Sequence, residues 1–310
     1  MQSLENFFKD NKKININVDN DGILSSCLLK KLYGCEVYGF NNNDKIIIHE
    51  KNTKYDDLVY IDLHVGYPHI KCLDQHCVSV KEEHNNLIKS NPNKINPNVE
   101  FDIVWQNYTN KFPFSTTIYI LAKADGEGKD LSDIDLKKQI TDKLQLGDLI
   151  WQTDSSCDNY IKYNRNATNW LERLREISNN GEFTNKLIDF LLNSMPSSNK
   201  DEMSLLALQA GIWYRENFHC TNNHGGIRDG YIKDDGHISE DLFNYLMTIG
   251  SLFNVDMSEI TNKEFIQTIF KAKRFNFKEI SERFDSTKLF SYALIYGLKS
   301  EYANISLTYE

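Results

Sequence analysis

The sequence predicts an α/β fold, with a parallel sheet flanked by helices and a mainly α-helical second half. Short β-prone apolar runs alternate with helical stretches in the first 80 residues or so, and acidic side chains directly follow several of these runs. From about residue 159 onward, apolar residues recur with the period of a helix. We therefore expect two domains, residues 1–158 and residues 159–310.

The first elements form a strand, a helix and a second strand. Residues 14–18 (Ile-Asn-Ile-Asn-Val) are a β-prone run that ends at Asp19. Residues 23–33 have helical periodicity, and Gly34 is placed where a glycine commonly ends a helix. Residues 35–40 then resume as a strand. This order is typical of a parallel sheet whose strands are connected by helices.

Two more apolar runs, at 45–49 and 58–63, predict further strands. A helix is expected at 115–123, where Ser115 and two threonines form the first turn, and a long helical pattern is expected at 136–151. The helices expected in the second half lie at 170–177, 183–192, 203–214, 242–253, 265–270 and 289–298.

Composition excludes some classes of function. Lys and Arg total 35 against 44 for Asp and Glu, a net charge of -9, so no global basic field attracts long nucleic acid. The six cysteines form no CxxC pair, which favours a reducing compartment. No apolar stretch approaches the roughly 18 residues of a membrane span, and the polar start lacks a signal-peptide core. We expect a cytoplasmic protein with no membrane association.

Carboxylates and a histidine follow the predicted strands. Asp19 and Asp21 lie on a glycine-bearing loop, Asp62 follows a run too apolar for a surface turn, and Asp74 and His76 come a dozen residues later. Loops after successive parallel strands meet at one edge of a sheet. Carboxylate oxygens suit Mg²⁺ or Mn²⁺, so the sequence predicts a metal site there. The alternatives are an ordinary turn, a helix cap at Asp74 and a core imidazole at His76.

The order of these motifs resembles the DHH phosphoesterase family. Residues 18–25 (Val-Asp-Asn-Asp-Gly-Ile-Leu-Ser) resemble the first motif of the family, Asp62 resembles its second, and residues 74–76 (Asp-Gln-His) resemble the Asp-His-His triplet that names it. The resemblance covers roughly residues 13–155. It extends to the helix start at 115–117 and to a late aspartate.

The resemblance implies a phosphoesterase with two metal ions, usually Mn²⁺ (or Mg²⁺), that hydrolyses phosphodiester bonds of short oligonucleotides or small nucleotides, as a phosphodiesterase or exonuclease does. It implies catalytic roles for Asp74 and His76. Two residues compete for the late aspartate, Asp154 and Asp148, and the Thr-Asp-Ser string around Asp154 is closer to the family pattern. The metal ligands that it implies are Asp19, Asp21, Asp62 and this late aspartate.

Two positions depart from the family pattern. Asn15 and Gln75 stand where the family has histidines, and an amide oxygen is a weaker ligand than imidazole for Mn²⁺. His64, on the loop after Asp62, is a candidate substitute ligand; its alternative is an exposed loop residue. The departures leave a second hypothesis open, a catalytically impaired nucleotide-binding or assembly module. A pyrophosphatase or polyphosphatase is a further alternative.

The second half offers two weaker signals for substrate binding. His224, Gly225, Gly226 and Arg228 form a glycine-rich stretch that resembles the phosphate-binding loop of many family members, although a plain turn has the same composition. Residues 271–278 interleave basic and aromatic side chains, as a single-strand binding groove does; we interpret them as a solvated helix end with core-facing phenylalanines.

Overall fold

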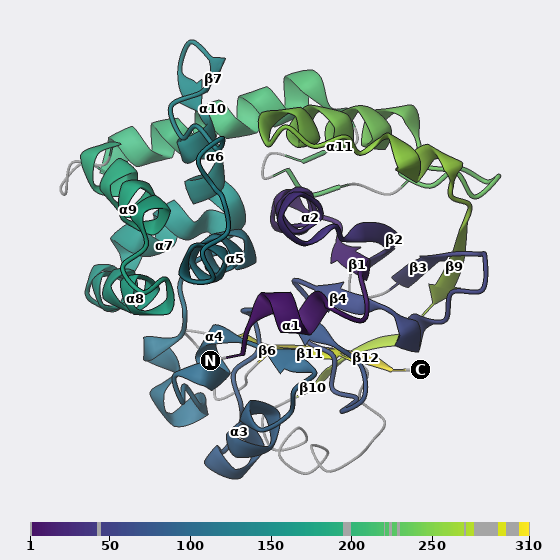
Figure 1. The fold of residues 1–310 in the computed structure, drawn as a ribbon, viewed down its shortest axis with the longest axis horizontal. Helices are drawn as coiled ribbons and strands as arrows, with labels where there is room; N and C mark the ends of the chain where they lie inside the picture. The colour runs from purple at the N-terminus through teal and green to yellow at the C-terminus, as the bar shows by residue number, and fades with distance from the viewer. Residues whose placement is uncertain are drawn as a thin grey trace.

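The predicted α/β class is confirmed by a computed structural model of the chain (Figure 1). A seven-stranded sheet has the order β6-β5-β4-β1-β2-β3-β9, and helices pack around it. The structure describes residues 2–41, 45–194, 200–219, 221–222, 225–227, 230–269, 271–275, 291–295 and 304–309.

The sheet is parallel over most of its width. β1 pairs in parallel with β2 and β4, and β5 pairs in parallel with β4 and β6. β3 is antiparallel to both of its neighbours, β2 and β9. The strands of this sheet are β1 (Lys13–Asn17), β2 (Glu36–Asn41), β3 (Lys45–His49), β4 (Val59–Ile61), β5 (Cys72–Leu73), β6 (Lys94–Ile95) and β9 (Phe265–Ile269).

The first strand-helix-strand unit follows from its sequence. Asp19 is the N-cap of α2 (Asn20–Tyr33) and accepts a hydrogen bond from the main-chain N–H of Gly22 at 2.9 Å. A Cβ on Gly22 would lie 2.1 Å from the carbonyl oxygen of Asn17, so only glycine allows this tight return over the end of β1. Gly34 ends α2 with φ +69°, as predicted.

Helices cover the sheet and extend beyond it. In Figure 1, α2 and α11 lie above the sheet, while α5 to α9 are gathered at its left. α5 packs against α2, α8 and α9, and so joins the helical group to the sheet. The helices are α1 (Leu4–Phe8), α3 (Glu82–Lys89), α4 (Pro97–Glu100), α5 (Thr116–Gly126), α6 (Leu146–Gln152), α7 (Ser156–Lys162), α8 (Asn164–Ile177), α9 (Glu182–Ser194), α10 (Lys200–Asn217) and α11 (Glu240–Leu252), with short 3₁₀ helices η1 (Tyr55–Asp57), η2 (Trp105–Asn110), η3 (Thr153–Ser155) and η4 (Ser258–Asn262).

The helices expected between residues 170 and 253 are confirmed in α8 to α11, but those expected near the C-terminus are wrong. Residues 265–269 form β9, in which Phe265 is 5% exposed and Ile266 is 47% exposed. This alternation has the period of a strand, and a run of five residues is too short to reveal it reliably. β10 (Lys271–Phe275) replaces the expected helix end, and β11 (Ser291–Ile295) replaces the last expected helix.

These two strands pair with β12 (Asn304–Tyr309) in an antiparallel sheet of order β10-β12-β11. The long helix expected at 136–151 is also wrong in its first part. There β7 (Gln139–Thr141) and β8 (Leu144–Gln145) form an antiparallel pair, and α6 begins only at Leu146. β9 belongs to the second predicted domain but pairs with β3 of the first. The domain boundary at 158 stays a prediction.

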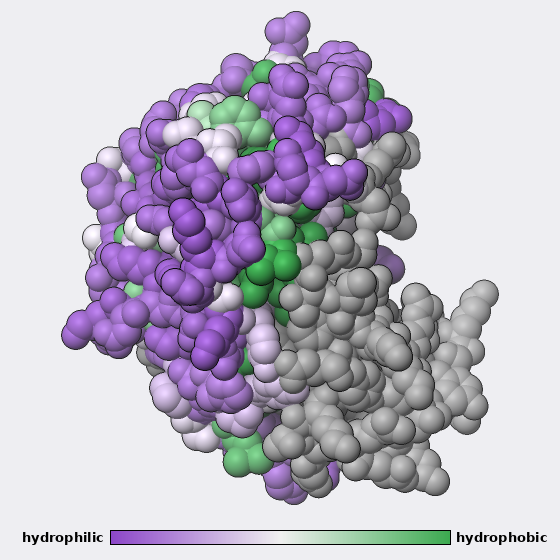
Figure 2. All heavy atoms as spheres, turned by 90° about the vertical axis from the view of Figure 1, so that its right-hand side faces the viewer, coloured by the Kyte–Doolittle hydropathy of each residue, from purple (hydrophilic) through white to green (hydrophobic). Residues whose placement is uncertain are grey.

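Few large apolar side chains are exposed among the described residues. Figure 2 shows one face on which hydrophilic residues prevail and hydrophobic ones form small groups. Within the described ranges, no helix is both long enough and apolar enough to cross a bilayer. The described cysteines are buried, and the large apolar side chains that are exposed among the described residues lie on separate elements: Leu87, Tyr163, Leu192, Leu208 and Ile266.

Candidate metal centre

Acidic side chains meet at the carboxyl-end edge of the parallel strands. Asp62 directly follows β4, Asp74 directly follows β5, and Asp19 lies two residues beyond β1. Main-chain hydrogen bonds continue past the strand ends: the N–H of Asp62 donates to Leu73 at 2.9 Å, and that of Asp74 to Ile95 at 3.0 Å. These hydrogen bonds therefore fix the backbone positions from which the side chains of Asp62 and Asp74 project.

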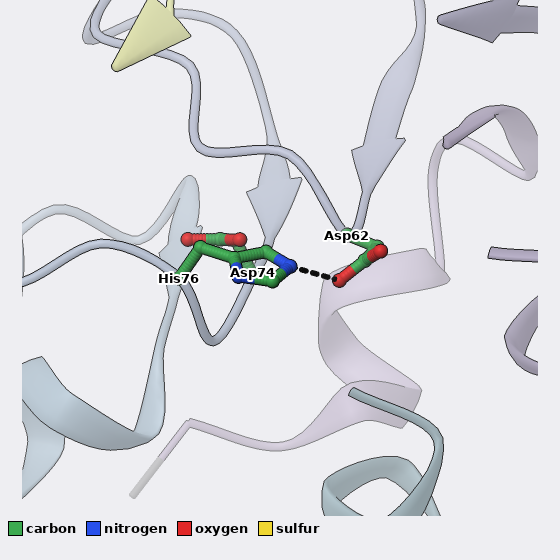
Figure 3. Close-up of side chains that lie close together, drawn as sticks. All are labelled: Asp62, Asp74 and His76. Atoms are coloured by element: carbon green, nitrogen blue, oxygen red, sulfur yellow. Dashed lines mark ion pairs between the residues drawn. The ribbon is translucent and has the colours of Figure 1, made fainter. Parts of the chain in front are cut away.

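Asp62, Asp74 and His76 form a compact group of possible metal ligands (Figure 3). One ligand atom from each lies within 4.8 Å of the others. His76 Nε2 is 3.0 Å from Asp62 Oδ1, and 30% of the His76 side chain is exposed while both carboxylates are buried. The group therefore reaches solvent only through the imidazole.

The two carboxylate oxygens of Asp74 differ in their hydrogen bonding. Its Oδ2 accepts hydrogen bonds from the N–H of Cys77 at 2.8 Å and from Asn96 Nδ2 at 3.3 Å. Its Oδ1 is buried and has no hydrogen-bond partner within the part of the chain that the structure describes. Leaving a buried acceptor unsatisfied costs about 1–3 kcal/mol, and more for a charged one. A cation would satisfy this oxygen.

Asp62 is held in an unusual backbone conformation. Its φ of +59° lies in the left-handed region, which is strained for a residue other than glycine. Thr116 Oγ1 at the start of α5 donates to Asp62 Oδ1 at 2.8 Å, and Asn17 Nδ2 lies 3.3 Å from Asp62 Oδ2. The two donors orient the carboxylate toward His76.

His64 lies apart from this group, although it follows Asp62 by two residues. Its Nδ1 is 4.0 Å from the Cys72 sulfur. Burial, and then the charge of Lys94, hold the pKa of His64 well below its ordinary value. Lys94 is itself bound to three carbonyl oxygens of this loop, those of Val65, Tyr67 and Ile70. The expected role of His64 as a substitute ligand gains no support from this position.

Asp19 and Asp21 are both engaged in organising helix starts. Asp19 accepts from Gly22 N–H and, at 2.7 Å, from Asn17 Nδ2. Asp21 accepts from the N–H groups of Thr116 at 2.7 Å and Thr117 at 2.8 Å, and from the Thr117 hydroxyl at 2.6 Å. Asp21 thereby places a carboxylate at the N-terminus of α5, where the helix dipole favours negative charge.

Of the two late aspartates, Asp154 lies beside the group and Asp148 does not. Asp154 Oδ2 accepts a hydrogen bond of 2.7 Å from Gln75 Nε2, and its backbone φ is +48°. Asp148 accepts from the N–H of Gln145 at 2.8 Å and so caps α6. Gln75, which replaces an expected histidine, thus binds an aspartate by its amide nitrogen.

The other variant position, Asn15, is fully buried inside β1. Its Oδ1 accepts from Asn41 Nδ2 at 2.7 Å, and its Nδ2 has no partner among the described residues. Reversing both amides would keep the hydrogen bond between them and would turn the oxygen of Asn15 outward instead. In the arrangement observed here, Asn15 presents a donor and not a ligand.

Burial and mutual repulsion raise the pKa values of three carboxylates, those of Asp19, Asp21 and Asp62. Burial, followed by the charge of Asp21, raises the pKa of Asp19 to about 7. Burial also raises the pKa of Asp21 and raises that of Asp62 well above its ordinary value. Burial lowers the pKa of His76, but the neighbouring Asp62 outweighs it and the net pKa is well raised. In the described ranges no Lys or Arg forms an ion pair with these aspartates, so protons or a metal ion must neutralise them.

The predicted substrate loop lies against the first motif. The N–H of Ile227 donates to the carbonyl of Val18 at 2.7 Å, and Gly225 contacts Asn20 and Tyr214 so closely that a Cβ there would lie 2.9 Å and 2.8 Å from them. The N–H groups of Gly225 and Gly226 are both bonded to Asn222, so they do not form an anion cradle here. His224 and Arg228 lie outside the described residues.

Three residues that hold the carboxylates were not singled out as site residues by the sequence: Asn17, Thr116 and Asn96. Each of them had a signal in the sequence. Thr116 lies in the helix start at 115–117, to which the resemblance extends. Asn17 alternates with Asn15 and Asp19, so it shares their face of β1. Asn96 follows the run that became β6 and directly precedes Pro97 at a helix start.

Comparisons with protein-family models, with curated proteins and with solved structures found no match to this chain.

Proposed function

We propose that the chain is a metal-dependent phosphoesterase of DHH type that uses Mn²⁺ or Mg²⁺ to hydrolyse phosphodiester bonds in short oligonucleotides or small nucleotides. The supporting observation is the group of Asp62, Asp74 and His76, in which the buried Asp74 Oδ1 has no hydrogen-bond partner within the described part of the chain. Order along the chain and position at the sheet edge both agree with the resemblance of the motifs.

The donor set fits a divalent cation. Two adjacent ligands of an octahedral ion, each about 2.1 Å from it, lie about 3.0 Å apart. His76 Nε2 and Asp62 Oδ1 are separated by 3.0 Å. Two carboxylates and an imidazole suit Mn²⁺ better than Ca²⁺, because imidazole is a ligand of transition metals. Asp62, Asp74 and His76 would therefore hold the ion.

A bound cation would supply polarisation of a phosphoryl oxygen and activation of a water molecule. The residues of the chain orient the metal ligands and enclose the site. Thr116 and Asn17 fix Asp62, and Cys77 and Asn96 fix Asp74. His76 is the partly exposed member of the group, so substrate approaches past its imidazole.

The charge distribution favours a short substrate. The chain carries a net charge of -9, and binding long polyanions depends on many Lys and Arg contacts. Pyrophosphate and polyphosphate concentrate more negative charge on few atoms, so a cluster of aspartates that has no Lys or Arg ion-pair partner in the described ranges suits them less. We therefore rank pyrophosphatase or polyphosphatase activity below phosphodiesterase activity.

A second candidate is a catalytically impaired nucleotide-binding or assembly module. The observation that favours it is the hydrogen bonding of the two variant amides, since Gln75 donates to Asp154 and the amide oxygen of Asn15 accepts from Asn41. Neither residue supplies the imidazole that the resemblance implies.

Hydrolysis assays separate the two candidates. With Mn²⁺, the purified chain is expected to cleave members of a panel of dinucleotides, short oligonucleotides and cyclic dinucleotides. Asp62→Asn should reduce the rate at least about 100-fold, since removing even an outer-shell partner of a metal costs 10–100-fold. The matched control is Asp148→Asn, another buried aspartate, which should stay active. An intact panel, or full activity in Asp62→Asn, would refute the phosphoesterase proposal.

A further inference from the structure

The carboxylate oxygens around the centre differ in the hydrogen bonds that they already accept. Asp74 Oδ1 has no partner among the described residues. Asp62 Oδ1 faces His76 Nε2 at 3.0 Å and accepts from the hydroxyl of Thr116, a side-chain donor that can rotate away, so these atoms can close around an ion with little rearrangement. Together with His76 Nε2, these oxygens define one cation position. The remaining carboxylates near it are Asp19, Asp21 and Asp154.

Asp19 and Asp21 have no oxygen without a donor. Each oxygen of Asp19 accepts one hydrogen bond, and those of Asp21 accept from two main-chain N–H groups and a hydroxyl. The main-chain donors belong to the first turns of α2 and α5. They cannot be withdrawn without disturbing a helix start, so Asp19 Oδ1 and both oxygens of Asp21 are poorly placed to bind a second ion. Asp19 Oδ2 accepts from the side chain of Asn17, and this single oxygen needs a further carboxylate beside it to define a second position.

Asp154 is held by Gln75. A flipped Gln75 amide would set its oxygen against Asp154 Oδ2 at 2.7 Å, so the amide nitrogen faces the carboxylate. The same nitrogen is 3.2 Å from both ring nitrogens of His76, which places it over the ring face and not in line with either lone pair. Asn98 Nδ2 donates to the carbonyl oxygen of Gln75 at 2.7 Å and anchors its backbone.

We infer that the centre has a single resident cation position, formed by Asp62, Asp74 and His76, and that Gln75 is a positioning residue that holds Asp154 away from any second ion. The inference rests on the proposed metal centre but not on hydrolysis. An N–H donor at position 75 occupies an oxygen of Asp154. An imidazole there offers a lone pair and releases Asp154, so that the two together create a second position.

The test is the number of Mn²⁺ ions bound by the metal-stripped full chain, measured by calorimetric titration with Mn²⁺ alone. The wild type is expected to bind one equivalent tightly, and Gln75→His two. Asp154→Asn should keep the single equivalent with its affinity changed less than about tenfold, because Asp154 lies outside the resident position. Combining it with Gln75→His should return the number to one. Asparagine tolerates the left-handed backbone of residue 154.

Two tight equivalents in the wild type would overturn the inference and leave the proposed function standing. A folded Gln75→His that still binds one, or loss of the wild-type site in Asp154→Asn, would also overturn it. Should Gln75→His fail to show a cooperative melting transition, the single variant Asp154→Asn still decides. A wild type that binds no Mn²⁺ would defeat the metal centre itself, and with it both the proposed function and this inference.

Discussion

At the scale of single residues, hydrogen-bond donors decide what each aspartate of the cluster can do. Asp21 accepts three hydrogen bonds from the first turn of α5 and so stabilises the start of that helix. Asp74 keeps a buried oxygen that has no partner among the described residues and that could bind the proposed cation. Burial raises the pKa of Asp21 and of Asp62, so protonation reduces the repulsion between these buried carboxylates.

This cluster predicts the pH dependence of stability without metal. The raised pKa of Asp19, about 7 against an ordinary 3.8, means that the folded chain binds this proton more tightly than the unfolded chain. The pKa of His76 is likewise raised above 6.5. A raised folded-state pKa gives stability that is present at low pH and lost as pH rises. We expect the free energy of unfolding in EDTA to fall between about pH 4 and 7 through Asp19, and further through His76 above pH 6.5.

Urea denaturation at several pH values measures this slope. Asp62→Asn is the comparison, because it removes one buried charge, weakens the hold on the His76 proton and should flatten the fall. Adding Mn²⁺ at pH 8 should restore stability to the wild type more than to this variant. Stability that rises with pH over this window, or an unchanged slope in Asp62→Asn, would contradict the electrostatic account.

The sequence could indicate the acidic residues of the centre but not the geometry around them. Asp62 and Asp74 follow buried strands, so their meeting depends only on strand order. The position of His64 depends on the left-handed φ of Asp62, which redirects the chain so that the imidazole meets Cys72. A backbone angle of that kind has no signature in residue order, because aspartate adopts several conformations.

At the scale of elements, the described part of a loop, residues 221–222 and 225–227, connects the second half of the chain to the first motif. Gly225 has φ +72° and lies between Asn20 and Tyr214, while the Tyr245 hydroxyl donates to its carbonyl oxygen at 3.1 Å. The loop therefore packs on the start of α2, close to Asp19 and Asp21. The loop brings its backbone into close contact with the first motif.

Gly225→Ala tests this packing. The left-handed φ costs a side chain about 1 kcal/mol or more, and the Cβ would also clash with Tyr214 and Asn20. Gly128→Ala is a matched control, because Gly128 has φ +71° and nothing within 4 Å of its Cβ position. We expect Gly225→Ala to lose at least about 1 kcal/mol more stability in urea than the control, and to lower phosphodiesterase activity. Equal losses would show that the loop is not packed as described.

Elements fixed by local patterns could be predicted, and elements fixed by distant pairing could not. The β1-α2-β2 unit has an N-cap, a C-terminal glycine and apolar strands within a single stretch of sequence. β9 instead gains its structure by pairing with β3, more than 200 residues earlier in the chain. Its five residues fit a helix as well as a strand until that partner is known.

At the scale of the whole molecule, the sheet presents its carboxyl-end edge to helices from both halves of the chain. α5 approaches this edge with its N-terminus, where Thr116 and Thr117 bind Asp62 and Asp21. The fold thus surrounds an acidic centre with uncharged donors. Protons, or the cation that we propose, would balance the charge of such a centre.

The most direct test is a crystal structure of the chain soaked in Mn²⁺, with the metal located by its anomalous scattering. The account predicts an anomalous peak at the carboxyl-end edge of β4 and β5, with Asp62, Asp74 and His76 each about 2.0–2.3 Å from the ion. No peak at this edge, or an ion bound there without Asp74, would contradict it.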